Sequence, residues 1–311
     1  MKFLLAAAAM AVIALSAPVS VMGQDKASQN DVKWTHPVAP FRIVGNVYYV
    51  GTEGLAAYLI ASGHRAILLD GTLAQNAPLI ERNIEALGFK LTDVKIIVNS
   101  HAHFDHAGGI AQLRRDTGGR VYASSGDRWA LEHGEHDSDT DYPRGHFPKV
   151  AVDHVLRDGE VVALGGVRLT ATFTPGHTKG CTTWSTKVVD AGRPVTGRVL
   201  NVVFPCSVTV AGNILVGNRA YPQIADDFER SFGVLDRMKA DVVLTNHPDV
   251  ADVLGRQARA KAGDRNAFVD PGLLHRIVAE ARADFATELA QARAGSSPSS
   301  NKSLARGGLH G

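Results

Sequence analysis

The apolar positions of this chain fall into short runs separated by glycines. Between residues 41 and 69, β-branched runs at 41–50, 55–60 and 66–69 are punctuated by Gly51 and Gly63, a pattern typical of consecutive strands joined by tight turns. Further apolar runs of strand length predict strands at 94–98, 120–123, 161–163, 167–173, 181–189, 198–204 and 241–244.

Helical spacing of apolar residues marks four other segments. One begins near Pro78 and stops at Gly88, positions that favour a helix start and a helix end. The others are predicted at 109–115, 226–238 and 274–289. Two strand-rich halves with helices outside them predict a layered α/β sandwich, with no repeat or linker that divides the body.

Two polar stretches carry no clear period. Residues 24–40 are dotted with proline and are interpreted as an N-terminal arm. Residues 124–150 contain His133, His136 and His146 and are interpreted as a long surface excursion. The end of the chain, residues 296–311, is rich in serine and glycine and is predicted to be a disordered tail.

The N-terminus has the pattern of a secretory signal peptide. Lys2 precedes an apolar run that ends at Leu15, and small residues follow it. The run is shorter than the roughly 20 apolar residues of a membrane span, which leaves an uncleaved anchor as the weaker alternative. We expect residues 1–23 to be removed and residues 24–295 to form one exported, periplasmic domain without stable membrane association.

Composition narrows the class of partner. The 33 Lys and Arg residues nearly balance 31 Asp and Glu residues, for a net charge of +2, and no basic run is present. Nucleic acid is therefore not an expected partner, and the expectation is a monomer that acts on a small molecule.

The chain has two cysteines, Cys181 and Cys206, at the edges of predicted strands. In an exported protein they can oxidise, and pairing of the two strands as a hairpin would bring them face to face. The alternatives are two buried thiols, or one thiol near a metal.

The highest concentration of potential metal-ligating residues lies directly after the predicted strand at 94–98. His101, His103, Asp105 and His106 fall within six residues, and imidazole and carboxylate are the usual nitrogen and oxygen ligands of Zn²⁺. His101 and His103 can point to one side of an extended segment, whereas Asp105 and His106 fall in the turn. A purely structural explanation of this cluster is much weaker than a metal site.

Four ligands do not complete two zinc sites, so further donors are expected downstream. His177 and His247 each follow an apolar strand, as the first cluster does. A layered fold would bring these strand ends to one edge, where loops build sites on a rigid scaffold. The other histidines outside the polar excursion lack this context and are interpreted as solvated surface residues: His36, His64, His154, His275 and His310.

The sequence His101-x-His103-x-Asp105-His106, with His177 and His247 downstream, resembles the signature of the metallo-β-lactamase superfamily. The resemblance extends from about residue 41 to about residue 275. It implies a four-layer αβ/βα sandwich with a dinuclear metal site at the edge where the two sheets meet.

Within the superfamily, the chain is most similar to the subclass B3 β-lactamases. The segment that starts at Gly176-His177-Thr178 looks like the B3 pattern, and Ser207 stands where B1 and B2 enzymes place a zinc-binding cysteine. Thioesterases of the glyoxalase II type and lactonases carry a metal-bridging aspartate in this region, yet residues 191–225 contain neither Asp nor Glu. Cys206 is adjacent to Ser207, and a shift of one residue would make it a B1-like ligand.

The resemblance implies two zinc ions per chain. One would be bound by His101, His103 and His177, the other by Asp105, His106 and His247, which leaves no role for Cys206. A hydroxide bound between the metals would attack the β-lactam carbonyl of penicillins, cephalosporins or carbapenems, and catalytic Asp105 would orient it. Ser207 and Thr209 are candidates to bind the substrate carboxylate, or else are ordinary strand-end hydroxyls.

Two other classes of function stay open. An exported lactonase, or another hydrolase of this fold, would cleave esters without cleaving β-lactams. A metal-binding protein without catalysis would hold zinc with no open coordination position; six ligands for two metals argue against it.

Overall fold

The computed structural model describes residues 29–138, 140, 145–190 and 197–296. The predicted signal peptide (1–23) and residues 297–311 of the predicted tail lie outside the described residues. No helix within the described ranges is both long enough and apolar enough to cross a membrane.

Seven strands form the N-terminal sheet in chain order, from β1 to β7. The first four strands pair antiparallel and the last four pair parallel. Central β3 and β4 are buried along their whole length, as expected for apolar runs covered on both faces. The strands are β1 (Phe41–Val44), β2 (Val47–Tyr49), β3 (Tyr58–Ala61), β4 (Ala66–Leu69), β5 (Val94–Val98), β6 (Arg120–Ser124) and β7 (His154–Leu156).

Five strands form the C-terminal sheet, in the order β12-β11-β10-β9-β8. All its pairs are antiparallel except β11 with β12. The strands are β8 (Val161–Leu164), β9 (Val167–Phe173), β10 (Thr182–Val189), β11 (Val199–Phe204) and β12 (Val242–Val243).

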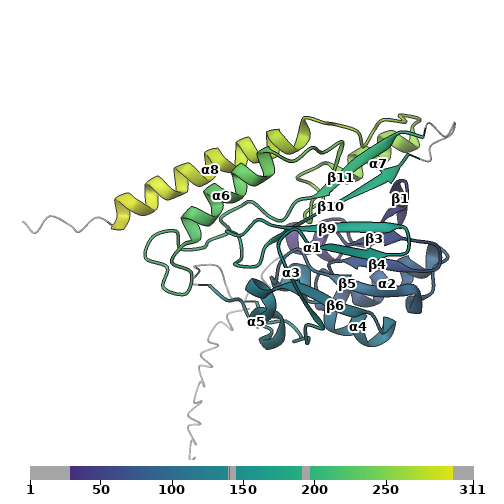
Figure 1. Cartoon of the computed structure of the whole chain (residues 1–311), viewed down its shortest axis with the longest axis horizontal. Coiled ribbons are helices and arrows are strands. Elements are labelled where there is room, and N and C mark those ends of the chain that lie inside the picture. Colours follow the sequence, from purple (N-terminus) through teal and green to yellow (C-terminus); the bar gives the residue numbers. More distant parts are fainter. Residues whose placement is uncertain (1–28, 139, 141–144, 191–196, 297–311) are drawn as a thin grey trace, which may run out of the picture.

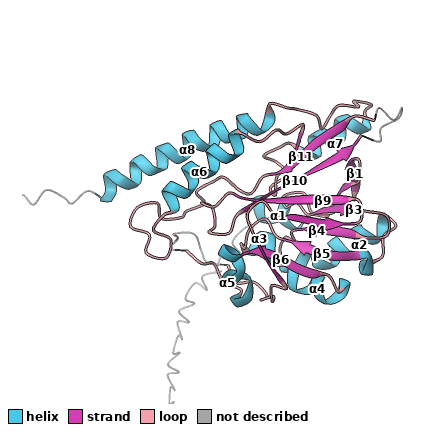
Figure 2. Ribbon diagram, in the orientation of Figure 1, coloured by secondary structure: helices cyan, strands magenta, loops and turns pink. Residues whose placement is uncertain are grey.

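Helices cover the outer faces of the two sheets, which gives the four-layer αβ/βα sandwich that the sequence predicts (Figures 1 and 2). In Figure 1, α4 and α5 lie at the bottom beside β5 and β6, α2 lies to the right of β4 and β5, and α6 and α8 lie together at the top, above β9. The helices are α1 (Gln29–Thr35), α2 (Ala77–Ala86), α3 (Phe104–Ala107), α4 (Ile110–Thr117), α5 (Ser125–His133), α6 (Ile224–Asp236), α7 (Val253–Lys261) and α8 (Leu273–Ser296), with short 3₁₀ turns at Ala74–Asn76 and Leu91–Asp93.

Three apolar cores correspond to the three interfaces between these layers. Tyr58 and Trp184 meet in the core between the sheets, because alternate residues of each strand face inward. Leu68 of β4 packs with the apolar sides of α2 and α4. Phe228 of α6 and Phe285 of α8 pack with tilted rings, their centroids 5.1 Å apart, in the core above the second sheet.

Buried hydrogen bonds join the two sheets at one edge. The indole Nε1 of Trp184 donates to the carbonyl of Asn99 at 3.0 Å, and the amide of Thr182 donates to the carbonyl of Ser100 at 2.8 Å. The hydroxyl of Tyr58 donates to the carbonyl of Thr245 at 2.7 Å. These bonds fix the loop after β5 against the loops of the C-terminal sheet.

Three sequence predictions require correction. The excursion at 124–150 begins with helix α5, and the arm at 24–40 contains helix α1. The apolar run at 41–50 is two strands, because Gly45 adopts a positive φ of 53° and turns the chain between β1 and β2. The His154 side chain, interpreted as a solvated surface residue, is 39% exposed in β7, and it also contacts Glu160 at 2.6 Å.

Cys181 and Cys206 form a disulfide in the structure. Strands β10 and β11 pair antiparallel, with Trp184 opposite Phe204, so the cysteines just beyond these strand ends meet with Cα atoms 5.8 Å apart. Both side chains are buried. The bond therefore closes the β10–β11 hairpin beside the loop that carries His101.

Replacing Cys206 by serine should lower the thermal stability of the protein and leave its capacity to bind metal unchanged. The lost crosslink spans 25 residues, for which loop entropy predicts about 3 kcal/mol of stabilisation. Thermal unfolding and metal analysis of Cys206→Ser check this, with Cys181→Ser as the matched control because both variants lose the same bond. A loss of zinc in Cys206→Ser alone would instead indicate a sulfur ligand.

Candidate metal centre

The loop between β5 and α4 places four polar side chains at the sheet edge. His101 and His103 lie on extended backbone, and His103 immediately precedes α3. Asp105 and His106 belong to α3, and their ligand atoms lie within 4.8 Å of a ring nitrogen of His101. His101, Asp105 and His106 are buried, so these groups face the interior of the protein.

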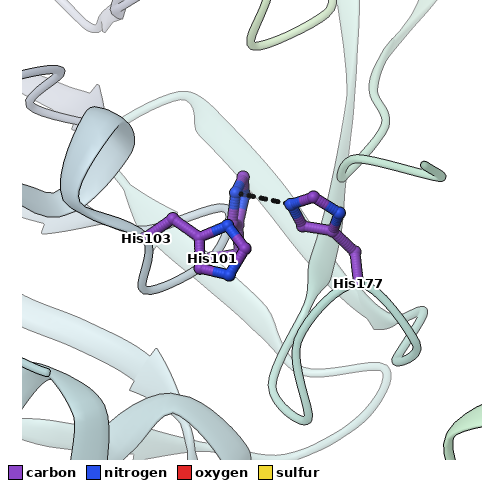
Figure 3. Close-up of side chains that lie close together, drawn as sticks. All are labelled: His101, His103 and His177. Atoms are coloured by element: carbon purple, nitrogen blue, oxygen red, sulfur yellow. Dashed lines mark hydrogen bonds between the residues drawn. The ribbon is translucent and has the colours of Figure 1, made fainter. Parts of the chain in front are cut away.

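His177 joins His101 and His103 to form a first cluster (Figure 3). One ligand atom from each of the three side chains lies within 4.8 Å of the others. The Nε2 atoms of His101 and His177 are 3.2 Å apart, which Figure 3 marks with a dashed line. His177 reaches this position from the loop between β9 and β10, so the cluster joins the two sheets.

Asp105, His106 and His247 form a second cluster. The Nε2 atom of His106 is 3.1 Å from Nε2 of His247 and 3.2 Å from Oδ2 of Asp105. His247, which follows β12, lies 3.5 Å from the same Asp105 oxygen. The ring centroids of His101 and His106 are 4.3 Å apart, so the two clusters are adjacent.

Hydrogen bonds from the rest of the chain orient two of these rings. Nδ1 of His177 contacts the carbonyl of Thr209 at 2.7 Å. Nδ1 of His101 lies 3.1 Å from Oγ of Ser100 and 3.3 Å from Nδ2 of Asn246. A proton on Nδ1 of His177 leaves its Nε2 lone pair free, and such outer contacts fix the ring that binds a metal.

The surroundings favour the charged carboxylate and four of the five neutral imidazoles, the forms that bind metals. The exception is His106, whose pKa is raised because the adjacent Asp105 carboxylate outweighs burial. Burial lowers the pKa values of His177 and His247 to about 4 and holds those of His101 and His103 well below their ordinary range. Burial alone would raise the pKa of Asp105, but the nearby rings of His106, His247 and His103 together outweigh it and hold this pKa well below its usual value.

The donor set fits divalent zinc. Five imidazoles and one carboxylate converge, and zinc prefers such nitrogen and oxygen ligands. Among the described residues, His103 Nε2 and His106 Nδ1 are buried ring nitrogens without a hydrogen-bond partner. Buried polar atoms are normally paired, so these orphaned nitrogens agree with a site built for a metal.

A cleft with about 700 Å³ of open space lies over both clusters, and His103, Asp105, His177 and His247 line it. Thr209 also lines this cleft, and its side chain is exposed. Ser207, in contrast, is not among the residues that line this cleft. Its hydroxyl lies 3.0 Å from the side-chain nitrogen of Asn246.

Sequence reasoning missed three other residues of the cleft. Trp34 of α1 lies with its ring centroid 5.9 Å from His247 and 6.2 Å from Phe104. His136, which follows α5, lies with its ring centroid 4.3 Å from that of His103. The sequence carries no strand-end context for Trp34 or His136, whereas Phe104 falls within the ligand cluster and could have been found there.

Comparison with known proteins places this geometry in a family. The family model "Metallo-beta-lactamase superfamily" matches residues 50–190. A subclass B3 metallo-β-lactamase of Bradyrhizobium japonicum is 40% identical with a TM-score of 0.79, and the match covers 85% of this chain and 98% of that one.

The chain belongs to the metallo-β-lactamase superfamily. A subclass B3 enzyme from a soil metagenome library is 36% identical, with a TM-score of 0.79 and coverage of 84% of this chain and 99% of that one. A hydroxyacylglutathione hydrolase of Maricaulis maris is 30% identical over 105 residues, which are 34% of this chain and 33% of the relative. The chain thus spans about a third of the length of the curated relatives it matches.

Members of this superfamily are hydrolases that use metal ions, typically zinc, on small-molecule substrates. The matches to subclass B3 structures cover nearly their full length, so they include the C-terminal half that supplies His247. The superfamily fold therefore agrees with the four layers and with the position of both clusters at the sheet edge.

Proposed function

We propose that this chain is an exported, periplasmic subclass B3 metallo-β-lactamase that hydrolyses the amide bond of β-lactam antibiotics with two zinc ions. The observation that carries the proposal is the pair of three-donor clusters that share one cleft. The full-length similarity to subclass B3 structures supports the substrate class.

In this proposal, His101, His103 and His177 would hold the first zinc ion, and Asp105, His106 and His247 the second. Bound zinc supplies Lewis-acid chemistry, in which a carbonyl oxygen is polarised and a water molecule loses its proton near neutral pH. Three protein donors per ion leave an open position, as catalytic sites require. The disulfide keeps Cys206 out of both ligand sets.

Residues of the chain itself would orient the reactants. Asp105 lines the cleft with its carboxylate charged, so one oxygen can accept a hydrogen bond from the attacking water. Thr209 offers an exposed hydroxyl at the cleft to the substrate carboxylate and holds His177 through its backbone carbonyl. Ser207 would act less directly, through the Asn246 amide that also contacts His101.

A thioesterase of the glyoxalase II type is the second candidate, because curated hydroxyacylglutathione hydrolases match part of the chain. The absence of Asp and Glu from residues 191–225 weighs against it. Asp105 of the first motif is the carboxylate that contacts His106 and His247 and lies within 4.8 Å of a ring nitrogen of His101.

A comparison of the hydrolysis rates of three substrates tests the proposal. The purified zinc-loaded protein is given a carbapenem, a glutathione thioester and a lactone under the same conditions, each with and without a chelator. We expect chelator-sensitive hydrolysis of the carbapenem with a kcat/KM well above those of the other two substrates. Hydrolysis of the thioester or the lactone without the carbapenem would overturn the proposal.

Replacing Trp34 by alanine should raise KM for β-lactams with little change in kcat. Its indole forms one wall of the cleft, and an aromatic contact contributes about 1 kcal/mol, or roughly a fivefold change in KM. Steady-state kinetics of Trp34→Ala check this against Trp129→Ala, which removes an indole that is 44% exposed on α5. Equal effects in both variants would contradict a substrate contact by Trp34.

A further inference from the structure

Asp127 is a buried carboxylate in the first turn of α5. We propose that Asp127 is a positioning residue. It holds the His101–His103 loop and the His177 loop at the relative position that binding of the first zinc ion requires. This inference rests on the ligand assignment above. Helix α5 lies in the stretch predicted to be a surface excursion, and through Asp127 it would stabilise the geometry of the metal site.

The Asp127 carboxylate accepts hydrogen bonds from both loops. Its Oδ2 accepts from the backbone amide of Ala102, the residue between His101 and His103, at 2.9 Å. Its Oδ1 accepts from the amide of Gly180 at 3.0 Å, and Oδ2 also accepts from the hydroxyl of Thr178 at 3.2 Å. One side chain therefore bridges a loop of the N-terminal sheet and a loop of the C-terminal sheet.

Close backbone packing prevents α5 and the His177 loop from shifting relative to each other. A Cβ atom on Gly180 would lie 2.2 Å from the amide nitrogen of Asp127, and one on Gly126 would lie 2.5 Å from the carbonyl carbon of Lys179. Backbone thus contacts backbone directly between α5 and the His177 loop. The hydroxyl of Ser124 adds a hydrogen bond to the carbonyl of Gly180 at 2.7 Å.

The chemistry of the bridge requires a group that only accepts. The three hydrogen-bond partners of the carboxylate are the amides of Ala102 and Gly180 and the hydroxyl of Thr178, and an ionised carboxylate can accept from all of them. An amide at position 127 would turn an N–H₂ group toward at least one N–H or O–H donor. A buried donor without an acceptor is costly, so Asp127→Asn should release one of the two loops.

The second cluster is held by other contacts. The amide of Gly71 donates to the carbonyl of His106 at 2.8 Å, and the amide of His247 donates to Oδ1 of Asn246 at 3.1 Å. The hydroxyl of Thr245 donates to the carbonyl of His247 at 2.7 Å. None of these bonds involves Asp127, so loss of its carboxylate should act on one zinc ion and spare the other.

Stepwise zinc binding to the purified full chain tests this inference. In Asp127→Asn we expect one of the two dissociation constants to rise by about 10-fold to 100-fold, as for other groups that orient metal ligands, and the other to change by less than about twofold. Thr178→Val removes one donor and should give a smaller rise in the same step, which keeps the test decisive if Asp127→Asn does not fold. Equal weakening of both steps, or of neither, would overturn the inference.

Asp153→Asn is the matched control. Asp153 also accepts from a backbone amide, that of Val121 at 2.8 Å, and from Arg114 at 2.8 Å, but it contacts no ligand loop. Its loss should affect thermal stability without separating the two zinc affinities. A split between the affinities in Asp153→Asn as large as that in Asp127→Asn would show that general destabilisation produces it, and would overturn the inference.

Hydrogen exchange separates this inference from the ligand assignment. The amides of Ala102 and Gly180 should exchange faster in Asp127→Asn than in the wild-type chain, whether or not zinc is bound. Wild-type binding of fewer than two zinc ions would contradict the ligand assignment, and the exchange data would still decide the role of Asp127. Unchanged exchange at both amides would contradict the bridge itself.

Discussion

His177→Ala is expected to lower kcat/KM for a carbapenem by about a thousandfold. His177 is buried, and its Nε2 lies 3.2 Å from that of His101, so alanine removes one of the three donors proposed for the first zinc ion. Stabilisation of the carbonyl charge by a metal is worth several kcal/mol, and about 4 kcal/mol corresponds to a thousandfold in rate. Steady-state kinetics measures the fall in kcat/KM, and metal analysis measures the loss of bound zinc.

His64→Ala is the control for this variant, because His64 is an exposed residue that follows β3 at a distance from both clusters in the sequence. It should retain full activity and full zinc content. Turnover by His177→Ala within a few-fold of the wild-type value, at the wild-type zinc content, would remove His177 from the ligand set.

The second large effect is expected at Asp105. Asp105→Asn keeps the size of the side chain but removes the charge that lies 3.2 Å from His106 and 3.5 Å from His247. An amide binds the second zinc ion more weakly and its nitrogen does not accept a proton or a hydrogen bond from water. We expect kcat to fall by about a thousandfold, in the range of lost acid–base assistance, with a smaller change in KM.

Zinc supplementation separates the two roles of Asp105. Adding excess zinc to Asp105→Asn should restore the second ion without restoring kcat, because occupancy returns and the carboxylate does not. Full recovery of kcat at saturating zinc would show that Asp105 acts only as a ligand. A kcat that never falls would contradict both roles.

The cluster at the sheet edge could be predicted because each part of it follows an apolar strand. His101, His103 and Asp105 come after β5, and His177 comes after β9. His247 comes after β12, although this strand is only two residues long. In a layered sheet these strand ends share one edge, so the pattern in the sequence predicts proximity in space.

The rest of the cleft could not be predicted, because tertiary contacts place it there. Helix α5 is short and its Trp129 is exposed, so its apolar pattern does not stand out from the polar stretch around it. Trp34 reaches the cleft because its carbonyl accepts hydrogen bonds from Thr52 and from Asn76, contacts that span 18 and 42 residues of sequence. Helical periodicity and turn signals report only on near neighbours along the chain.

The disulfide is an intermediate case. The apolar runs around Cys181 and Cys206 indicate two strands, but these runs alone do not specify that the two strands pair with each other as a hairpin. Once β10 and β11 pair antiparallel, their ends fix the separation of the two Cα atoms at 5.8 Å, within the usual range for a disulfide. A single sequence predicts the strands more securely than their register.

The most direct test of the dizinc account is a zinc titration of the metal-free chain with carbapenem hydrolysis followed at each step. The two three-donor clusters predict that activity rises until two equivalents are bound and then stays constant. A chelator should then abolish it. Saturation at one equivalent, or no carbapenem hydrolysis with two zinc ions bound, would contradict the account.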